Sequence, residues 1–329
     1  MKNKKIIIGI IGFGVIGQKR ANAIQESKHG KIRAICDTNN IDFKKFNFKD
    51  KNIYFTKLWN DIIIDTEINT VIISANNILN KKILFHALKN KKNCIIEKPI
   101  IISNNYFKKL EMLSRNKLVI EVGYNLKYFD SILKVKKILS NKSFGRIIDI
   151  DIEYSNGSRL NFHKEWRANK MLSGGGVSID LGVHCLDIVS FLCNNLKFKQ
   201  LKYIKGQNVI TKDVEDILYL NLLLEKDILV NIKSSWRRWK NIFKLNIVGQ
   251  KKMLSLNGLT GSYGHPNLIV YSRKLFKGKP KEDIIKCEDD NSFLNQWKSF
   301  VSKINKNNFK NNQLKESFLI SEVIRKVYK

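Results

Sequence analysis

Residues 5–24, K-I-I-I-G-I-I-G-F-G-V-I-G-Q-K-R-A-N-A-I, decide the fold of this chain. The apolar run Ile6–Ile11 predicts a buried strand, and the residues after Gly17 predict an amphipathic helix. Between them lies a G-x-G-x-x-G motif, in which Gly12 allows a tight turn, Gly14 the close approach of a pyrophosphate, and Gly17 the packing of helix on strand. The free N–H groups and the dipole at a helix N-terminus favour anions. We therefore predict that a dinucleotide binds along Gly12, Phe13, Gly14, Val15, Ile16 and Gly17.

Asp37 strengthens this prediction, because it ends the second apolar strand, Ile32–Cys36, and lies 20 residues beyond Gly17. A carboxylate at that position can hydrogen-bond the ribose hydroxyls of an adenosine. It also repels a 2′-phosphate, and the residues that follow, 38–40, bring no guanidinium to bind one. The predicted cofactor is therefore NAD rather than NADP. The alternative is a glycine-rich turn followed by an ordinary surface aspartate.

The rest of the pattern divides the chain into two α/β domains. Up to residue 122, short apolar strands alternate with helices, which predicts a parallel, doubly wound Rossmann sheet. The stretch Ile147–Tyr154 alternates apolar and polar residues, and similar stretches follow at residues 217–223, 228–232 and 245–248. This alternation predicts an open, mostly antiparallel sheet with one covered face. Residues 293–329 carry apolar side chains at helical spacing. We predict an NAD-binding Rossmann domain over residues 1–122 and a domain for substrate binding and oligomerisation over residues 123–329.

Two motifs carry candidate catalytic side chains, and the first is Glu97-Lys98-Pro99. It follows a predicted strand of the first domain, and the carboxyl ends of such strands face the ligand crevice. A partly desolvated lysine there can exchange a proton or hydrogen-bond the reacting oxygen. The alternative is a solvated lysine at a strand end.

The second motif is G-G-G-V-S-I-D-L-G-V-H-C-L-D, residues 174–187. Asp180, His184 and Asp187 are spaced i, i+4 and i+7, so they lie on one face of an otherwise apolar helix. An imidazole exchanges protons near neutral pH, and a neighbouring carboxylate can orient it. One alternative is a core histidine satisfied by these carboxylates. Another is a metal site that includes His163, but no recognised ligand spacing supports it, so no metal is predicted.

These motifs, with Val122-Gly123-Tyr124-Asn125 between them, resemble the family of glucose-fructose oxidoreductase, inositol dehydrogenase and MocA proteins. The resemblance spans most of the chain in the right order. It implies a Rossmann domain followed by an open-sheet domain, a nicotinamide cofactor, and the action of Lys98, Asp180 and His184 on a hydroxyl of a sugar or cyclitol.

The resemblance also implies cofactor and substrate contacts, with some departures. Relatives often carry Thr-Pro and then His beside the nicotinamide, where this chain reads Ser74–Asn80. Lys127 stands where Arg is common, a change expected to alter how an acidic group on the substrate is held. The stretch Gly261–Gly264, G-S-Y-G, resembles a feature of relatives that act in surface-polysaccharide and nucleotide-sugar metabolism. Outside the glycine motif, the predicted cofactor contacts are Asp37, Ser74, Asn76, Glu97 and Lys98. The predicted substrate contacts are Tyr124, Asn125, Arg159, His163, Trp166, Arg167, Asp180 and His184. The aromatic and arginine side chains among them, with His163, are chosen because sugars favour aromatic faces and fork-shaped donors, and the alternative for each is packing within a loop.

Composition restricts the setting in which the protein works. The formal net charge is +31, but the lysines are spread along the chain, so we expect no specific nucleic-acid partner, only attraction of anionic ligands such as dinucleotides and phosphorylated sugars. The five cysteines include no C-x-x-C pair, which favours a reducing compartment. Glycines break the apolar N-terminal run, and no apolar stretch reaches the roughly 20 residues that span a bilayer. We expect a cytoplasmic protein that does not associate with membranes.

The sequence thus predicts an NAD-dependent oxidoreductase, a homo-oligomer (dimer or tetramer). It would transfer a hydride between nicotinamide and a hydroxyl or keto carbon of a sugar, a cyclitol or a nucleotide sugar. One alternative is a non-catalytic, NAD-binding sensor of the same fold. Another is a basic nucleic-acid-binding protein, which would show a steep salt dependence of DNA affinity.

Overall fold

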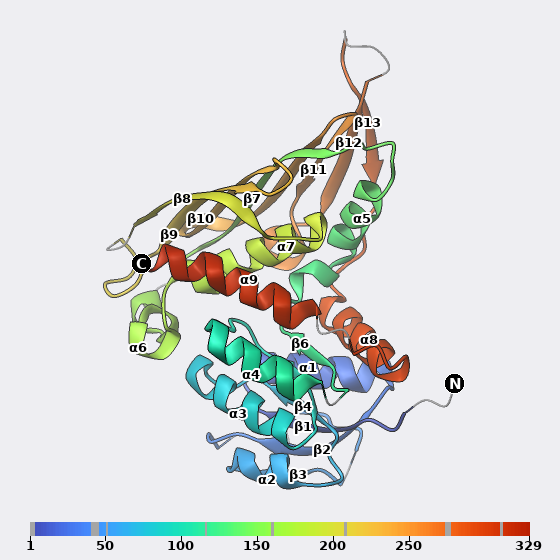
Figure 1. The fold of residues 1–329 in the computed structure, drawn as a ribbon, viewed down its shortest axis with the longest axis vertical. Coiled ribbons are helices and arrows are strands. Elements are labelled where there is room, and N and C mark those ends of the chain that lie inside the picture. The colour runs from blue at the N-terminus through green and yellow to red at the C-terminus, as the bar shows by residue number, and fades with distance from the viewer. Residues whose placement is uncertain are drawn as a thin grey trace. The chain divides into compact units, whose positions relative to one another are not determined.

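The computed structural model describes residues 4–40, 46–50, 52–115, 117–158, 161–206, 209–273, 278–309 and 312–329. The chain forms two compact units, which are coloured along the sequence in Figure 1. The first unit comprises residues 1–125 and 292–321, and the second comprises residues 126–291 and 322–329.

The first unit is built on a six-stranded parallel sheet in the order β3-β2-β1-β4-β5-β6. Its apolar strands are buried because helices cover both faces, as doubly wound sheets require. The predicted Rossmann fold is therefore confirmed. The strands are β1 (Ile7–Ile11), β2 (Lys31–Cys36), β3 (Tyr54–Thr56), β4 (Thr70–Ile73), β5 (Asn93–Ile96) and β6 (Ile120–Val122). The helices that connect them are α1 (Val15–Ser27), α2 (Trp59–Ile64), α3 (Asn77–Lys89) and α4 (Asn104–Ser114).

A helix from the far end of the sequence completes the first unit. Helix α8 (Ser292–Asn305) packs on α1, and its Trp297, Phe300, Val301 and Ile304 join the core of the sheet. The indole of Trp297 also donates to the carbonyl of His29 at 2.9 Å. The predicted boundary placed all of residues 123–329 in one domain, whereas residues 292–321 group with the first unit because their apolar stripe is buried there. The next helix, α9 (Asn312–Val327), begins in this unit and ends in the second.

The second unit contains the predicted antiparallel sheet, in which the described residues form seven strands. The order is β13-β12-β11-β10-β9-β8, with β7 paired to β10. The predicted strands near residues 228–232 and 245–248 are parts of one long strand, β10. The strands are β7 (Ile147–Gly157), β8 (Phe198–Gly206), β9 (Ile217–Leu224), β10 (Leu229–Gly249), β11 (Lys252–Asn257), β12 (Asn267–Ser272) and β13 (Lys281–Ile285). Helices α5 (Asp130–Leu139), α6 (Lys170–Ser173) and α7 (Val183–Cys193) belong to the same unit.

Helix α7 lies in the core of the second unit, packed against α5 and β7 (Figure 1). It continues directly from a π-helical turn, η5 (Ser178–Gly182). Among the described residues, the helical run Lys170–Cys193 is the one that is long and apolar enough to cross a membrane, and 89% of its most apolar window is buried inside the fold. Burial within a sheet-covered core explains that composition, because a central helix is apolar all round.

Candidate active site

The glycine motif forms a tight turn between β1 and α1. Gly12 has φ +87°, a left-handed conformation that favours glycine, and a Cβ there would collide with the backbone carbonyl of Ser74. Its N–H donates to the carbonyl of Cys36 at 2.8 Å, which ties the turn to the end of β2. A Cβ at Gly17 would meet the carbonyl of Gly12. The predicted roles of these two glycines, turn and close packing, match this geometry.

The residues at this turn fit a dinucleotide. An ideal Cβ at Gly14 meets nothing within 4 Å, so that position opens onto free space. Gly14 is also the N-cap of α1, and no side chain caps the helix there. The first N–H groups of α1 are therefore available to an anion, with the favourable end of the helix dipole behind them. Phe13 has a fully buried ring that packs on Phe46 and Phe48, so it can contribute only its backbone.

Asp37 lies beside the same turn. Its Oδ2 accepts a hydrogen bond from the N–H of Phe13 at 2.7 Å, and its Oδ1 accepts from the N–H of Asn39 at 2.9 Å. Two backbone donors thus hold the carboxylate next to the glycine motif. Each carboxylate oxygen has a second lone pair, so Asp37 can still accept from ribose hydroxyls.

The parallel register brings the other predicted cofactor residues to one edge of the sheet. Ile11 pairs with Ile73, and Ile73 pairs with Ile96, so the residues that follow these strands lie side by side at the carboxyl ends. Ser74 donates to the carbonyl of Gly12 at 2.6 Å and so braces the glycine turn. This edge is where doubly wound sheets bind ligands.

The remaining predicted cofactor residues differ in their surroundings. Asn76 caps α3 by accepting from the N–H of Leu79 at 2.9 Å. Glu97 accepts from Nε of the buried Arg20 at 2.7 Å, so its carboxylate has a structural partner. Lys98 follows Glu97 at the carboxyl edge and is half-buried.

In the second unit, the glycine-led motif is shaped by Glu215. A Cβ at Gly176 would collide with the backbone carbonyl of Glu215. The carboxylate of Glu215 accepts from the N–H groups of Gly176 and Ser178 at 3.1 and 2.9 Å, and from the hydroxyl of Tyr328 at 2.6 Å. Burial, with the Glu215 carboxylate next to it, raises the pKa of the Tyr328 phenol, so this donor stays protonated. These contacts fix the start of the helix that carries the predicted catalytic residues.

Asp180 and His184 follow on consecutive turns, Asp180 in η5 and His184 in α7. The carboxylate of Asp180 lies 3.8 Å from Nε of Arg167, a predicted substrate contact. His184 is only 6% exposed, and the ring of Tyr154 meets its imidazole edge to face at 5.8 Å. A π-helical turn inside a helix is frequent at functional sites.

The third residue of the predicted stripe, Asp187, has a structural partner. Its Oδ1 accepts from Nζ of Lys127 at 2.8 Å, and the two side chains are 1% and 3% exposed. Lys127 is thus engaged with the helix of His184, whereas the departure from Arg at this position had suggested a contact with the substrate.

Two tyrosines that sequence reasoning missed complete the surroundings of His184. Tyr154 of β7 stacks on Tyr263 with ring centroids 5.1 Å apart. Burial, together with Tyr263 and Asp180, raises the pKa of Tyr154 well above its usual value. Tyr263 lies in the short helix η6 (Gly261–Tyr263), within the G-S-Y-G stretch noted in the sequence. The alternation of β7 could have shown that Tyr154 faces inward, but nothing local indicates that Tyr263 returns to it.

The other predicted substrate contacts are dispersed. Trp166, 44% exposed, lies on η4 (Trp166–Ala168) beneath the guanidinium of Arg167, which is 4.7 Å from the ring centroid. His163 is exposed on η3 (Phe162–Lys164). Tyr124 is 1% exposed in the first unit, where Asn125 donates to Ser292 at 3.0 Å. Arg159 lies outside the described residues.

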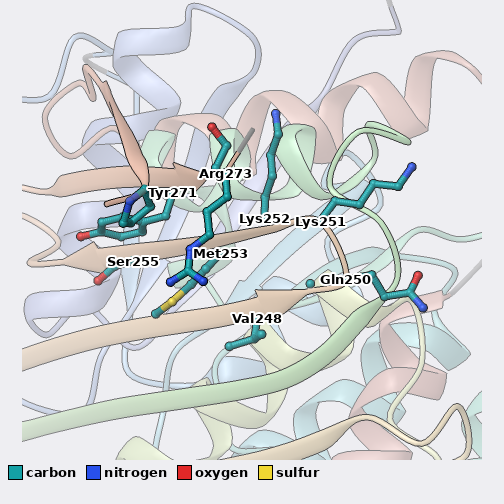
Figure 2. A pocket seen from close by; sticks show the side chains of 11 residues that line it. Val248, Gln250, Lys251, Lys252, Met253, Ser255, Tyr271 and Arg273 are labelled. Atoms are coloured by element: carbon teal, nitrogen blue, oxygen red, sulfur yellow. The ribbon is translucent and has the colours of Figure 1, made fainter. Parts of the chain in front are cut away.

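A cavity of about 760 Å³ lies away from all of these residues, on the sheet of the second unit. Figure 2 shows Lys251, Lys252 and Arg273 around it, with Tyr271 and Met253 at its wall. None of the predicted site residues lines it. In the part of the chain that the structure describes, no group of three or more His, Cys, Asp or Glu side chains could hold a metal ion.

Comparison with known proteins identifies the family. The model of the NAD-binding Rossmann fold of the GFO/IDH/MocA oxidoreductase family matches residues 6–124, and that of the GFO/IDH/MocA C-terminal domain matches residues 132–255. The chain is 27% identical over 302 residues to glucose-6-phosphate 3-dehydrogenase of Bacillus subtilis (strain 168), which covers 88% of this chain and 81% of that protein.

Two solved structures share the fold. Levoglucosan dehydrogenase in complex with NADH and levoglucosan has a TM-score of 0.84 at 16% identity, covering 99% of this chain and 98% of the other. UDP-N-acetylglucosamine 3-dehydrogenase from Acidithiobacillus ferrooxidans has a TM-score of 0.80 at 14% identity, covering 98% and 96%. With family models over both parts of the sequence, this chain belongs to the GFO/IDH/MocA family and is an NAD-dependent oxidoreductase.

Proposed function

We propose that the protein oxidises a secondary hydroxyl of a sugar, a cyclitol or a nucleotide sugar with NAD, and that His184 is the general base. The observation that carries this proposal is the polar cluster at the start of α7. There His184 and Asp180 lie next to hydrogen-bonding side chains from three other segments, namely Arg167, Tyr154 and Tyr263. A polyhydroxylated substrate needs such a set of donors and acceptors.

Each residue has a defined part in the proposed reaction. The substrate carbon loses a hydride, its C–O bond becomes a carbonyl, and the hydroxyl proton passes to the imidazole of His184. When bound, NAD supplies the hydride acceptor at its nicotinamide ring. Asp180 orients the base or a neighbouring hydroxyl, and Lys98 hydrogen-bonds the reacting oxygen and stabilises the charge that develops on it.

We extend the proposal to a sugar that carries a phosphate or a nucleotide, of the kind used in the synthesis of surface polysaccharides. The net charge of +31 supports an anionic substrate, because it speeds the encounter with anions. Two of the similar proteins are named for such sugars, glucose 6-phosphate and UDP-N-acetylglucosamine. The guanidinium of Arg167, 36% exposed, is a suitable donor to an anionic group.

The test is a screen for NADH formation with neutral sugars, cyclitols, sugar phosphates and nucleotide sugars. We expect turnover with one class, and a loss of about 10²–10⁴-fold in kcat for His184→Ala and for Lys98→Met. The affinity for NAD should stay nearly unchanged in both variants. His86→Ala and Lys89→Met, both on α3, are matched controls that should keep full activity.

Two results would count against the proposal. Turnover that survives both substitutions would remove His184 and Lys98 from the mechanism. Tight NAD binding with no turnover of any tested class would instead favour the alternative, a non-catalytic sensor of the same fold.

A further inference from the structure

The loop between β11 and β12 brings Tyr263 onto Tyr154, which in turn contacts the proposed general base. Tyr263 stacks on Tyr154 at 5.1 Å with an angle of 28° between the rings. The ring of Tyr154 in turn meets His184 at 5.8 Å and 84°. Three rings from three separate elements, η6, β7 and α7, therefore form a continuous row in the second unit.

Glycines allow the conformation of this loop, and Asn241 holds it in place through hydrogen bonds. Gly258, Gly261 and Gly264 all have positive φ, and a Cβ at Gly258 would lie 2.6 Å from the carbonyl of His265. The side chain of Asn241 donates to Ser262 at 2.6 Å and accepts from the N–H of Gly157 at 3.2 Å. The residue before Tyr263 is thus tied to the end of β7. These contacts fix the position of the Tyr263 phenol before a ligand binds, and a side chain that recognises a ligand needs to be held in place in this way.

The Tyr263 hydroxyl stays protonated and lies close to Asp180. Burial raises the pKa of the Tyr263 phenol, while the neighbouring side chains of Tyr154 and Asn156 oppose that rise. The raised pKa keeps its O–H protonated at neutral pH. Asp180 is close enough to raise the pKa of both tyrosines. The protonated O–H of Tyr263 is therefore a hydrogen-bond donor by its chemistry, and it lies near the proposed catalytic carboxylate.

A second polar atom in the same group points to a ligand. Oδ1 of Asn156 is buried and has no hydrogen-bond partner among the described residues. Buried polar side-chain atoms are nearly always satisfied, by protein, ordered water or ligand. Tyr154 and Tyr263 could pack equally well as phenylalanines, so packing alone does not account for this polar cluster.

We propose that Tyr263 is a specificity-determining residue, whose phenol donates a hydrogen bond to one hydroxyl of the substrate next to the carbon that is oxidised. The inference rests on the proposed function, because it names a contact of that same site. It predicts that the protein distinguishes sugars that carry this hydroxyl from deoxy analogues that lack it.

The experiment compares the wild-type protein with Tyr263→Phe, which removes one oxygen atom and keeps the ring. The best substrate from the screen and its series of monodeoxy analogues are used in two measurements. One is the affinity of each sugar for the NADH complex, read from the fluorescence of NADH. The other is steady-state turnover, which separates KM from kcat.

At one position of the sugar, we expect the effects on affinity of removing the sugar hydroxyl and of removing the Tyr263 hydroxyl not to multiply. Each change alone should weaken binding about tenfold, and the two together hardly more than one alone, because both remove the same hydrogen bond. KM should rise more than kcat falls. Tyr271→Phe, on β12 at the wall of the separate cavity, is the matched control and should behave like the wild type.

The inference is overturned if the effects multiply at every position of the series, or if Tyr263→Phe binds every sugar as the wild type does. An equal loss for all sugars, with a lowered unfolding temperature, would assign Tyr263 a purely structural role. If sugars bind but are not turned over, the proposed function is contradicted. The measured affinities would still show whether Tyr263 contacts a sugar hydroxyl. If no sugar binds to the NADH complex, both proposals fail.

Discussion

Removing the charge of Lys127 tests whether its ion pair with Asp187 holds the helix that carries His184. Nζ of Lys127 lies 2.8 Å from Oδ1 of Asp187, and both side chains are almost completely buried, at 3% and 1% exposure. Asp187 lies one turn after His184 in α7. The substitution Lys127→Met keeps most of the aliphatic chain and deletes the ammonium group.

The expected cost follows from distance and burial. At 2.8 Å and an effective dielectric constant of about 20, the Coulomb attraction is about 6 kcal/mol. The loss of hydration of both charges offsets much of it, but a carboxylate left buried without its cation costs about 3–5 kcal/mol in the free energy of unfolding. For a domain of this size, that lowers the melting temperature by about 6–20 °C.

The assay is thermal unfolding followed by circular dichroism and tryptophan fluorescence. The matched control is Lys199→Met, because Lys199 and Asp227 are 2.7 Å apart but 47% and 66% exposed. Solvent screens that pair, so its loss should leave the melting temperature unchanged. The double variant Lys127→Met with Asp187→Leu should recover most of the stability, since neither charge of this pair is left buried without the other.

Two results would refute this reasoning. One is a melting temperature of Lys127→Met that falls no further than that of Lys199→Met. The other is a double variant less stable than either single variant. Affinity for NAD should be unchanged throughout, because the glycine motif and Asp37 belong to the first unit.

Three further predictions follow from the geometry. Gly12→Ala should lower both stability and NAD affinity, whereas Gly14→Ala should weaken NAD binding alone, because its Cβ meets no protein atom; calorimetry of the free protein and titration with NAD separate the two. Tyr328→Phe should lower kcat several-fold and the melting temperature by a few degrees, because Glu215 loses one of its three donors at the start of the catalytic helix. Burial raises the pKa of the Cys36 thiol to about 11, so iodoacetamide at pH 8 should react about 100-fold more slowly than with an ordinary thiol, until the protein unfolds. Because this thiol ionises at lower pH when unfolded, its contribution should also make stability, measured by urea unfolding, fall as pH rises from about 9 to 11.

The sequence predicts the parts of the fold that local patterns encode. Apolar runs bounded by glycine or polar residues place the predicted strands Ile6–Ile11 and Ile32–Cys36 within one residue of the observed β1 and β2. The short strand β3 was not predicted, because its three residues are too few to form a distinct pattern. The glycine motif predicts the turn because only glycine accepts the conformation of Gly12. Asp37 follows β2 and lies beside that turn, because neighbouring parallel strands end at the same edge of the sheet.

Features that depend on distant partners were not predictable in the same way. The helical spacing of α8 shows which of its faces is apolar, but not which sheet covers that face. The stripe of Asp180, His184 and Asp187 suggested three residues of one site, yet the buried ammonium of Lys127 gives Asp187 a structural partner. Tyr263 returns to Tyr154 through a loop whose path depends on Asn241, more than 20 positions away. Long-range pairing of this kind leaves no periodic signal in the sequence.

The composition of the central helix explains why the proposed catalytic groups lie at its beginning. The run Lys170–Cys193 is apolar enough to resemble a membrane span, because its window is 89% buried. Polar side chains in such a setting need partners, and the partners are concentrated at the first turns, where Glu215 accepts from the backbone and Tyr154 covers His184. A low-dielectric environment strengthens the interactions of the charges that remain there. Burial therefore explains the apolar composition of the helix, and it also makes the first turns of the helix a suitable place for proton transfer.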